Sequence, residues 1–200
     1  MTKRLAGLIV VAVALLLSSC VSSTLIFTER DVENSSNLIG NPSFNPYSNV
    51  ASEALKGWSI HLDPPGGDSS PVIIDPSETK EGRTSLRINA SAKSVLILSD
   101  SFTVRRYGGY YLRSYVKTNS PLPPLVQLRF IAFKENGKIV NRFRHKRKPD
   151  TQWGLNTISA GFIKPGAKFG RVGIFIPPFK EGSIWIDDVG CFEVHGFKID

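Results

Sequence analysis

Residues 37–58 read NLIGNPSFNPYSNVASEALKGW, the pattern of two strands joined by a loop. Pro42 and Pro46 punctuate the loop, and a new strand is predicted to begin at Gly57 and Trp58. Proline has no backbone N–H to donate to a strand ladder, so the two prolines separate the predicted strands. A short helical turn is predicted inside the loop, at 50–55. The stretch therefore favours an all-β domain.

Downstream, apolar and polar residues alternate with the period of two that half-buried strands show. In 84–90, Leu86 and Ile88 fall on one side and Arg87 on the other, and 125–133 has the same pattern. Asn136 and Gly137 lie between two apolar runs and predict a tight hairpin. The predicted strands are 58–62, 72–75, 84–90, 95–98, 110–117, 125–133, 138–143, 156–162, 172–176 and 183–194. Many short strands with few helices predict one sandwich or barrel domain.

Four motifs, in order, resemble the carbohydrate-binding modules of families 4, 9 and 22. The first is the N-L-x-x-N-P-x-F signature followed by G-W, matched by Asn37, Leu38, Asn41, Pro42, Phe44, Gly57 and Trp58. The others are EGRTSLRI at 81–88, YLRSYVK at 111–117 and GSIWIDDV at 182–189. The resemblance implies a jelly-roll β-sandwich of the galactose-binding domain-like kind over 37–197, and a non-catalytic module that binds glycan.

The first 20 residues have the pattern of a bacterial lipoprotein signal. Lys3 and Arg4 precede an apolar run at 5–17 that is short for a membrane span, and LSSC at 17–20 resembles a lipobox. The resemblance implies that Cys20 carries lipid. Residues 21–36 are polar and have no sustained period, which predicts a flexible tether between membrane and domain. The protein would then be lipid-anchored to a bacterial membrane, periplasmic or at the cell surface, and on the outer membrane in a Gram-negative cell. An ordinary secretory signal or an uncleaved anchor is the alternative.

The chain carries a formal net charge of +8, which favours anionic surroundings such as acidic glycans or lipid headgroups. Nucleic acid is not expected as a partner, because no nucleic-acid-binding motif accompanies the charge. A lipidated Cys20 would leave Cys191 without a disulfide partner in the chain, and its apolar surroundings predict a small core residue.

The densest charge is RFRHKRK at 142–148. One interpretation is a solvated hairpin arm. The other is an anion-binding loop, in which Arg144, Lys146 and Arg147 bind carboxylate, sulfate or phosphate. Tyr107 and Trp153 flank predicted turns and are the aromatic residues favoured for sugar contacts, because a sugar ring presents apolar C–H faces to a flat π-system. Trp58 is expected in the core.

The family resemblance also implies a structural calcium ion. Its ligands would be Asp187, the residue at position 45 and oxygens near Glu81. Position 45 is acidic in the family but is Asn45 here, so a charge that Ca²⁺ prefers is missing. The alternative is that Asp187 accepts hydrogen bonds from backbone N–H groups and holds no metal.

Catalysis has little support in the sequence. His61, His145 and His195 lack metal-ligand spacing, and neither a nucleophile motif nor a paired-carboxylate motif is present. The first hypothesis is therefore a non-catalytic lipoprotein that binds polysaccharide or cell-wall glycan. The second is a structural or interaction lipoprotein that uses the same fold to bind another envelope protein.

Overall fold

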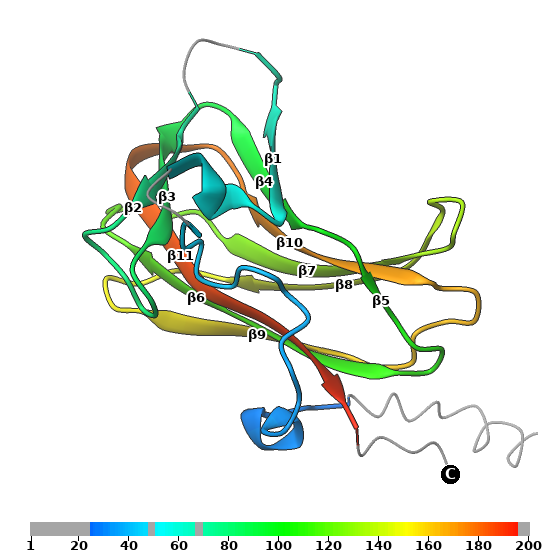
Figure 1. The fold of residues 1–200 in the computed structure, drawn as a ribbon. Helices are drawn as coiled ribbons and strands as arrows, with labels where there is room; N and C mark the ends of the chain where they lie inside the picture. The colour runs from blue at the N-terminus through cyan, green and yellow to red at the C-terminus, as the bar shows by residue number, and fades with distance from the viewer. Residues whose placement is uncertain (1–24, 48–50, 67–69, 196–200) are drawn as a thin grey trace, which may run out of the picture.

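The computed structural model describes residues 25–47, 51–66 and 70–195, which form two antiparallel β-sheets packed face to face (Figure 1). This confirms the predicted jelly-roll β-sandwich. Within the described residues, no helix is long and apolar enough to cross a bilayer. The predicted signal at 1–20, with Cys20, lies outside the described residues.

The two sheets interleave segments that lie far apart in the sequence. Sheet A has the order β2 (Val72–Asp75), β3 (Ser85–Ser91), β11 (Phe179–Val194), β6 (Gly109–Thr118) and β9 (Gly154–Ala160). Sheet B has the order β1 (Trp58–Asp63), β4 (Ser94–Ser99), β10 (Phe169–Ile176), β7 (Val126–Phe133) and β8 (Ile139–Arg147), and β5 (Phe102–Thr103) also pairs with β10. Two short 3-10 helices, η1 (Glu29–Val32) and η2 (Ala51–Leu55), precede the strands, and η2 confirms the turn predicted at 50–55.

Alternating residues from both sheets fill the core. Leu128 and Phe130 of β7 are fully buried, as are Leu112 of β6 and Ile186 of β11. Burial of each such side chain contributes about 1.5–3 kcal/mol, so the core between the two sheets supplies most of the favourable free energy of folding.

Residues 37–47 and 51–58 close one side of the core. The rings of Phe44 and Trp58 lie 5.0 Å apart, and both are buried. The indole N–H of Trp58 donates to the backbone oxygen of Asn41 at 2.8 Å, so its one polar atom is satisfied. Trp58 is thus a core residue, as its place in the sequence predicted.

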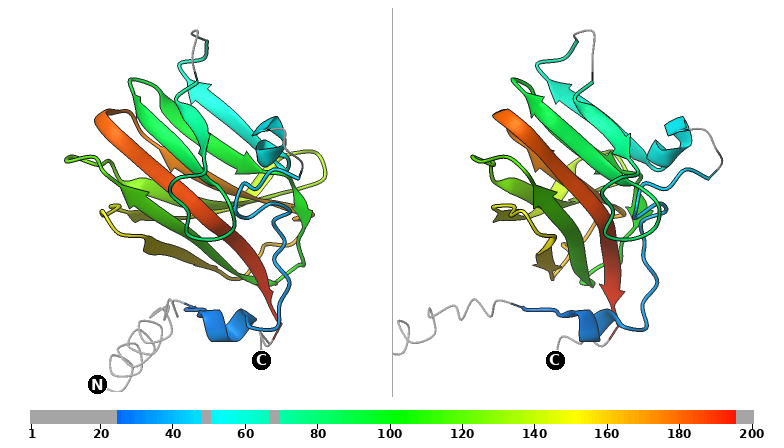
Figure 2. Two further views of the ribbon diagram at one scale, coloured as in Figure 1. Left: turned by 60° about the vertical axis from the view of Figure 1, so that its left-hand side comes forward. Right: turned by 90° about the vertical axis from the view of Figure 1, so that its left-hand side faces the viewer.

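Part of the segment predicted as a tether lies against sheet A. Residues 25–36 follow the end of β11, with η1 over it (Figure 2). Val32 is only 4% exposed and packs with Tyr111 and Val194. The guanidinium of Arg113 bridges Glu29 of this segment and Asp188 of β11, at 3.0 Å each. Residues 25–36 are therefore docked on the sandwich.

A hydrogen-bonded network joins β2, β3 and β11 on the outer face of sheet A. The carboxylate of Asp75 is 4% exposed and accepts from the indole of Trp185 at 2.9 Å, from Ser77 and from Arg87 at 3.1 Å. Burial opposes ionisation, but the hydrogen bonds from Ser77 and Trp185 and the charge of Arg87 outweigh it, so the pKa of Asp75 lies below its ordinary value.

We expect Asp75→Asn to lower the free energy of unfolding at neutral pH by about 2 kcal/mol, because the buried network loses its negative charge and one of its two acceptor oxygens. A carboxyl whose pKa falls on folding stabilises the protein above its unfolded pKa, and this contribution disappears as the pH falls through the folded pKa. The difference between wild type and variant should therefore shrink in acid. Urea unfolding at several pH values measures it, with the exposed Asp100→Asn as control. A difference that does not depend on pH would contradict this assignment.

Candidate functional site

The basic run at 142–148 forms a strand for most of its length. Residues up to Arg147 belong to β8, which forms a hairpin with β7 through the predicted turn at Asn136 and Gly137. Gly137 has a φ of +78°, which L side chains rarely adopt. The anion-binding loop expected from the sequence is therefore an edge strand of sheet B.

Because the run is a strand, its side chains separate onto two sides. Arg142, Arg144 and Lys146 are exposed on the outer face of sheet B. Phe143 points the other way and packs on Phe130, with ring centroids 6.2 Å apart. Phe143 therefore belongs to the core rather than to a ligand-stacking surface.

The neighbouring strands add to the charge on this face. Arg129 of β7 lies opposite Arg144 of β8, and Ile131 separates Arg142 from Arg171 of β10. Five outward-facing cations thus share one surface, which we call the cationic face: Arg129, Arg142, Arg144, Lys146 and Arg171.

Two of the guanidinium groups on the cationic face are held in place. Arg129 lies over the ring of Phe175, 4.3 Å from its centroid, and donates to Gln127 Oε1 at 3.1 Å. Arg171 donates through Nε to the backbone oxygen of Ser99 at 2.7 Å. Held side chains lose less conformational freedom when a ligand binds, which favours recognition.

No carboxylate balances this charge. None of β4, β10, β7 and β8 contains an aspartate or glutamate, and no ion pair among the described residues includes a member of the cationic face. Burial and the charge of Arg144 lower the pKa of Arg129. Such a cluster lacks an anion, and planar guanidinium groups match carboxylate or sulfate oxygens in pairs.

The outer face of sheet A differs in this respect. Arg87 pairs with Asp75, Lys117 pairs with Glu78 at 2.6 Å, and Arg113 pairs with two carboxylates. The docked N-terminal segment covers part of this face. Arg87, Lys117 and Arg113 are thus already neutralised, so the cationic face of sheet B is the better candidate for binding an anion.

Arg147 lies on a different side of β8 from Arg144 and Lys146. Arg147 turns toward the gap between the edge strands, where a Cβ atom built on Gly154 would lie 2.6 Å from its guanidinium. His145 also faces this gap and approaches Asn156 Oδ1 at 2.7 Å. A groove of about 610 Å³ runs along the gap beside Phe143 and Thr157.

The two predicted aromatic residues lie at opposite ends of the sandwich. Trp153 is half-buried just before β9, whose first residues pair with Val116 and Tyr115 of β6. Tyr107 precedes the other end of β6 and is 41% exposed, with Arg106 over its ring at 4.6 Å. At about 3.3 Å per residue, β6 separates them by roughly 30 Å. One short ligand therefore cannot contact both.

At the predicted calcium position, backbone N–H groups donate to the side-chain oxygens of Asp187 and Asn45. Asp187 is fully buried and accepts from the backbone N–H groups of Lys80 at 2.7 Å and Glu81 at 2.9 Å, while its second oxygen accepts from Asp188 at 2.7 Å. Burial raises the pKa of Asp187, and these donors partly offset the rise.

Asn45 has the same kind of partners. Its amide oxygen accepts from the backbone N–H groups of Arg83 at 2.8 Å and Thr84 at 3.2 Å. Among the described residues, no three histidine, cysteine, aspartate or glutamate side chains converge as metal ligands. Calcium requires six to eight oxygens directed at it. The side-chain oxygens of Asp187 and Asn45 instead accept hydrogen bonds from backbone N–H groups. These hydrogen bonds favour the alternative without metal, and the calcium site stays a prediction.

Sequence reasoning did not select Arg129, Arg171 or Phe175 as site residues. The alternation in 125–133 did place Arg129 on the outward side, and the hairpin signal put its strand beside the basic run. The position of β10 on the other side of β7 is a long-range pairing, and no local pattern indicates it.

No protein-family model matches this sequence, and no curated protein sequence matches it. Solved structures do match the fold. A CBM4 module matches at 14% identity with a TM-score of 0.53, over 78% of this chain and 99% of the module. The CBM22-1 xylan-binding domain of Paenibacillus barcinonensis Xyn10C matches at 13% identity with a TM-score of 0.54, over 80% of this chain and 96% of that domain.

The chain has the jelly-roll fold of the carbohydrate-binding modules. The enzymatically active domain of tailspike protein 4 from bacteriophage CBA120 also contains this fold, with a TM-score of 0.63 at 12% identity over 79% of this chain. This chain spans only 21% of that one. Identities of this size establish the fold, and the ligand has to be argued from the side chains.

We expect neither Ca²⁺ nor a chelator to shift the thermal midpoint, because Asp187 and Asn45 already bond to backbone N–H groups. Asn45→Ala should instead lower the free energy of unfolding by about 2 kcal/mol, since two N–H groups lose their acceptor. Differential scanning calorimetry with calcium or with EGTA measures both effects. A midpoint that falls on chelation would show that this loop does hold calcium.

Proposed function

We propose that this protein is a lipid-anchored, non-catalytic module that binds an anionic polysaccharide or cell-wall glycan through the cationic face. The supporting observation is the cluster of five outward cations on β7, β8 and β10, three adjacent strands that contain no carboxylate. An acidic glycan supplies negative charges along an extended chain, and a flat strand surface can contact several of them at once.

The chemistry of the face suits a charged sugar better than a neutral one. Arg144 and Lys146 are exposed at the edge of sheet B, where an incoming carboxylate or sulfate meets them first. Behind them, half-buried Leu98, Ile131 and Phe175 provide apolar surface for the C–H faces of sugar rings. Charge then supplies much of the binding free energy, and the apolar patch supplies the fit to a ring.

The same residues support the non-catalytic part of the proposal. Glycoside hydrolysis usually requires two carboxyl groups on either side of the scissile bond. The strands β4, β10, β7 and β8 provide cations and apolar residues but no such pair. The cationic face is therefore suited to holding a glycan rather than cleaving it.

Membrane attachment is the second part of the proposal and rests on the sequence. The lipobox-like LSSC at 17–20 would place lipid on Cys20, five residues before the docked segment begins at Leu25. The module would then hold glycan close to a bacterial membrane, facing the periplasm or the cell exterior.

An envelope protein is the alternative partner. The observation that favours it is that β8 and β9 each end a sheet, so each has one side without a strand neighbour in the described part of the chain. An extended acidic segment of another protein could pair with such an edge.

We expect Arg144→Gln/Lys146→Gln to weaken binding of an acidic polysaccharide by about tenfold or more, because charge-assisted hydrogen bonds contribute about 1.5–3 kcal/mol each. Added salt should weaken wild-type binding, since exposed charges are screened. Isothermal titration of the 21–200 fragment with polygalacturonate, and with neutral xylan for comparison, measures both effects.

The matched control is Arg30→Gln/Lys180→Gln, which removes two exposed charges on the sheet A side. An equal loss of affinity in the two double variants would show that only the net charge of the protein matters. That result would contradict binding through the cationic face. A folded wild-type fragment that binds no acidic glycan would refute the proposal and favour a protein partner.

A further inference from the structure

Several loops meet at one end of the sandwich, which we call the loop end: residues 104–108, 134–138 and 161–168, together with the docked segment at 25–27. The backbone N–H of Tyr107 donates to Ile163 at 2.9 Å, and that of Lys168 donates to Phe133 at 2.7 Å. The N–H of Phe27 donates to Ser159 Oγ at 2.7 Å, next to the same loops. These bonds make the loop end a defined surface.

Large apolar side chains are exposed at the loop end. Phe162 is 46% exposed, Tyr107 is 41% exposed and Ile26 is 75% exposed. Tyr107 and Phe162 both have positive φ, 59° and 55°, a conformation that non-glycine residues rarely adopt. Such a conformation persists where its surroundings fix it, and here the bonds between the two loops do so.

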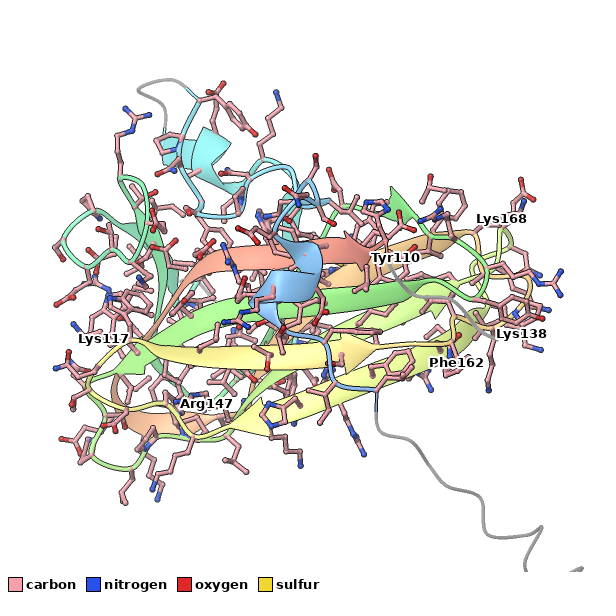
Figure 3. All side chains as sticks on the ribbon, turned by 90° about the horizontal axis from the view of Figure 1, so that it is seen from below. Tyr110, Lys117, Lys138, Arg147, Phe162 and Lys168 are labelled. Carbon is pink, nitrogen blue, oxygen red and sulfur yellow. The ribbon has the colours of Figure 1, made fainter. Side chains whose placement is uncertain are left out.

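Cations surround these rings. Arg106, Lys164 and Lys168 lie in the same loops as Tyr107 and Phe162, and Lys134 and Lys138 lie in the adjacent hairpin turn. Figure 3 shows Lys138, Phe162 and Lys168 together at this end, and Lys117 and Arg147 at the other. Of the acidic residues described there, Glu193 pairs with Arg105, and Glu135 is the only acid in the three loops.

Exposed aromatic residues among unpaired lysines and arginines are typical of surfaces that lie on membranes. The rings enter the interfacial region, and the cations attract anionic headgroups. The cationic face of sheet B has its charges on flat strands with half-buried apolar residues, whereas the loop end presents protruding rings. The two surfaces are therefore suited to different partners.

The position of the N-terminal segment indicates that the partner of the loop end is a membrane. The docked segment begins at Leu25, whose side chain lies against Gly161 in the loop end. The five residues from Cys20 to Leu25 can span at most roughly 17 Å, since an extended chain rises about 3.3–3.6 Å per residue. A lipid on Cys20 would thus hold the loop end next to the bilayer.

We propose that the loop end lies on anionic lipid headgroups of the membrane to which Cys20 is anchored; this rests on the lipid anchor in the proposed function. The strands then run away from the membrane, and the cationic face stays open to glycan.

The test uses the full-length lipidated protein in vesicles of phosphatidylcholine and phosphatidylglycerol. An environment-sensitive fluorophore is attached at Lys164→Cys in the loop end, or at Leu122→Cys, which is 84% exposed and lies in the 119–125 loop at the opposite end. Cys191 is buried and stays unlabelled. Quenching by lipids with brominated acyl chains should be strong at position 164 and absent at position 122.

Charge is tested with Arg106→Gln/Lys168→Gln in the protein labelled at position 164. Each lost cation near an anionic surface should shift the contact equilibrium about fivefold, so quenching should fall in this variant and in vesicles of phosphatidylcholine alone. The control Arg30→Gln/Lys180→Gln should leave quenching unchanged.

Anchored protein whose position 164 is quenched no more than position 122 would overturn this proposal and leave the anchor intact. Protein that does not float with vesicles would contradict the anchor, and this proposal with it. Neither result would affect glycan binding by the 21–200 fragment, which is measured without membrane.

Discussion

Side chains in a β-strand alternate between two faces, and a charged side chain cannot lie between two packed sheets without a partner. This constraint arranges the whole surface of the sandwich. In β7, Leu128 and Phe130 fill the core, so Arg129 between them must face outward. The same rule turns Arg144 outward while Phe143 packs inside. Charge on three adjacent strands is thus gathered on one surface because the other surface forms the core.

The two outer faces of the sandwich then differ in how their charge is balanced. On sheet A, Asp75, Glu78 and Asp188 neutralise Arg87, Lys117 and Arg113, and the N-terminal segment packs over one end. On sheet B, the outward positions of β7, β8 and β10 hold cations without a carboxylate among them. An ion pair inside the protein competes with any external anion, so the unpaired face is the one left to bind a ligand.

The sequence predicted most of the fold, because alternation, the Asn136–Gly137 turn and the family-like motifs are local patterns. It predicted Arg144 and Lys146 as contacts, and the structure places both on the cationic face. It could not separate Arg147 from them without knowing that the run is a strand. The roughly 30 Å between Tyr107 and Trp153, the docking of 25–36 and the donors around Asp187 depend on contacts between distant segments, which local patterns do not record.

The most direct test of the account is an NMR titration of the isotopically labelled protein with oligogalacturonate. The proposal predicts that shifted signals cluster on β7, β8 and β10, and that they include the side-chain N–H groups of Arg129, Arg144 and Arg171. Shifts confined to the outer face of sheet A or to the loop end, or no shifts at saturating ligand, would contradict the assignment of the cationic face as the glycan-binding surface.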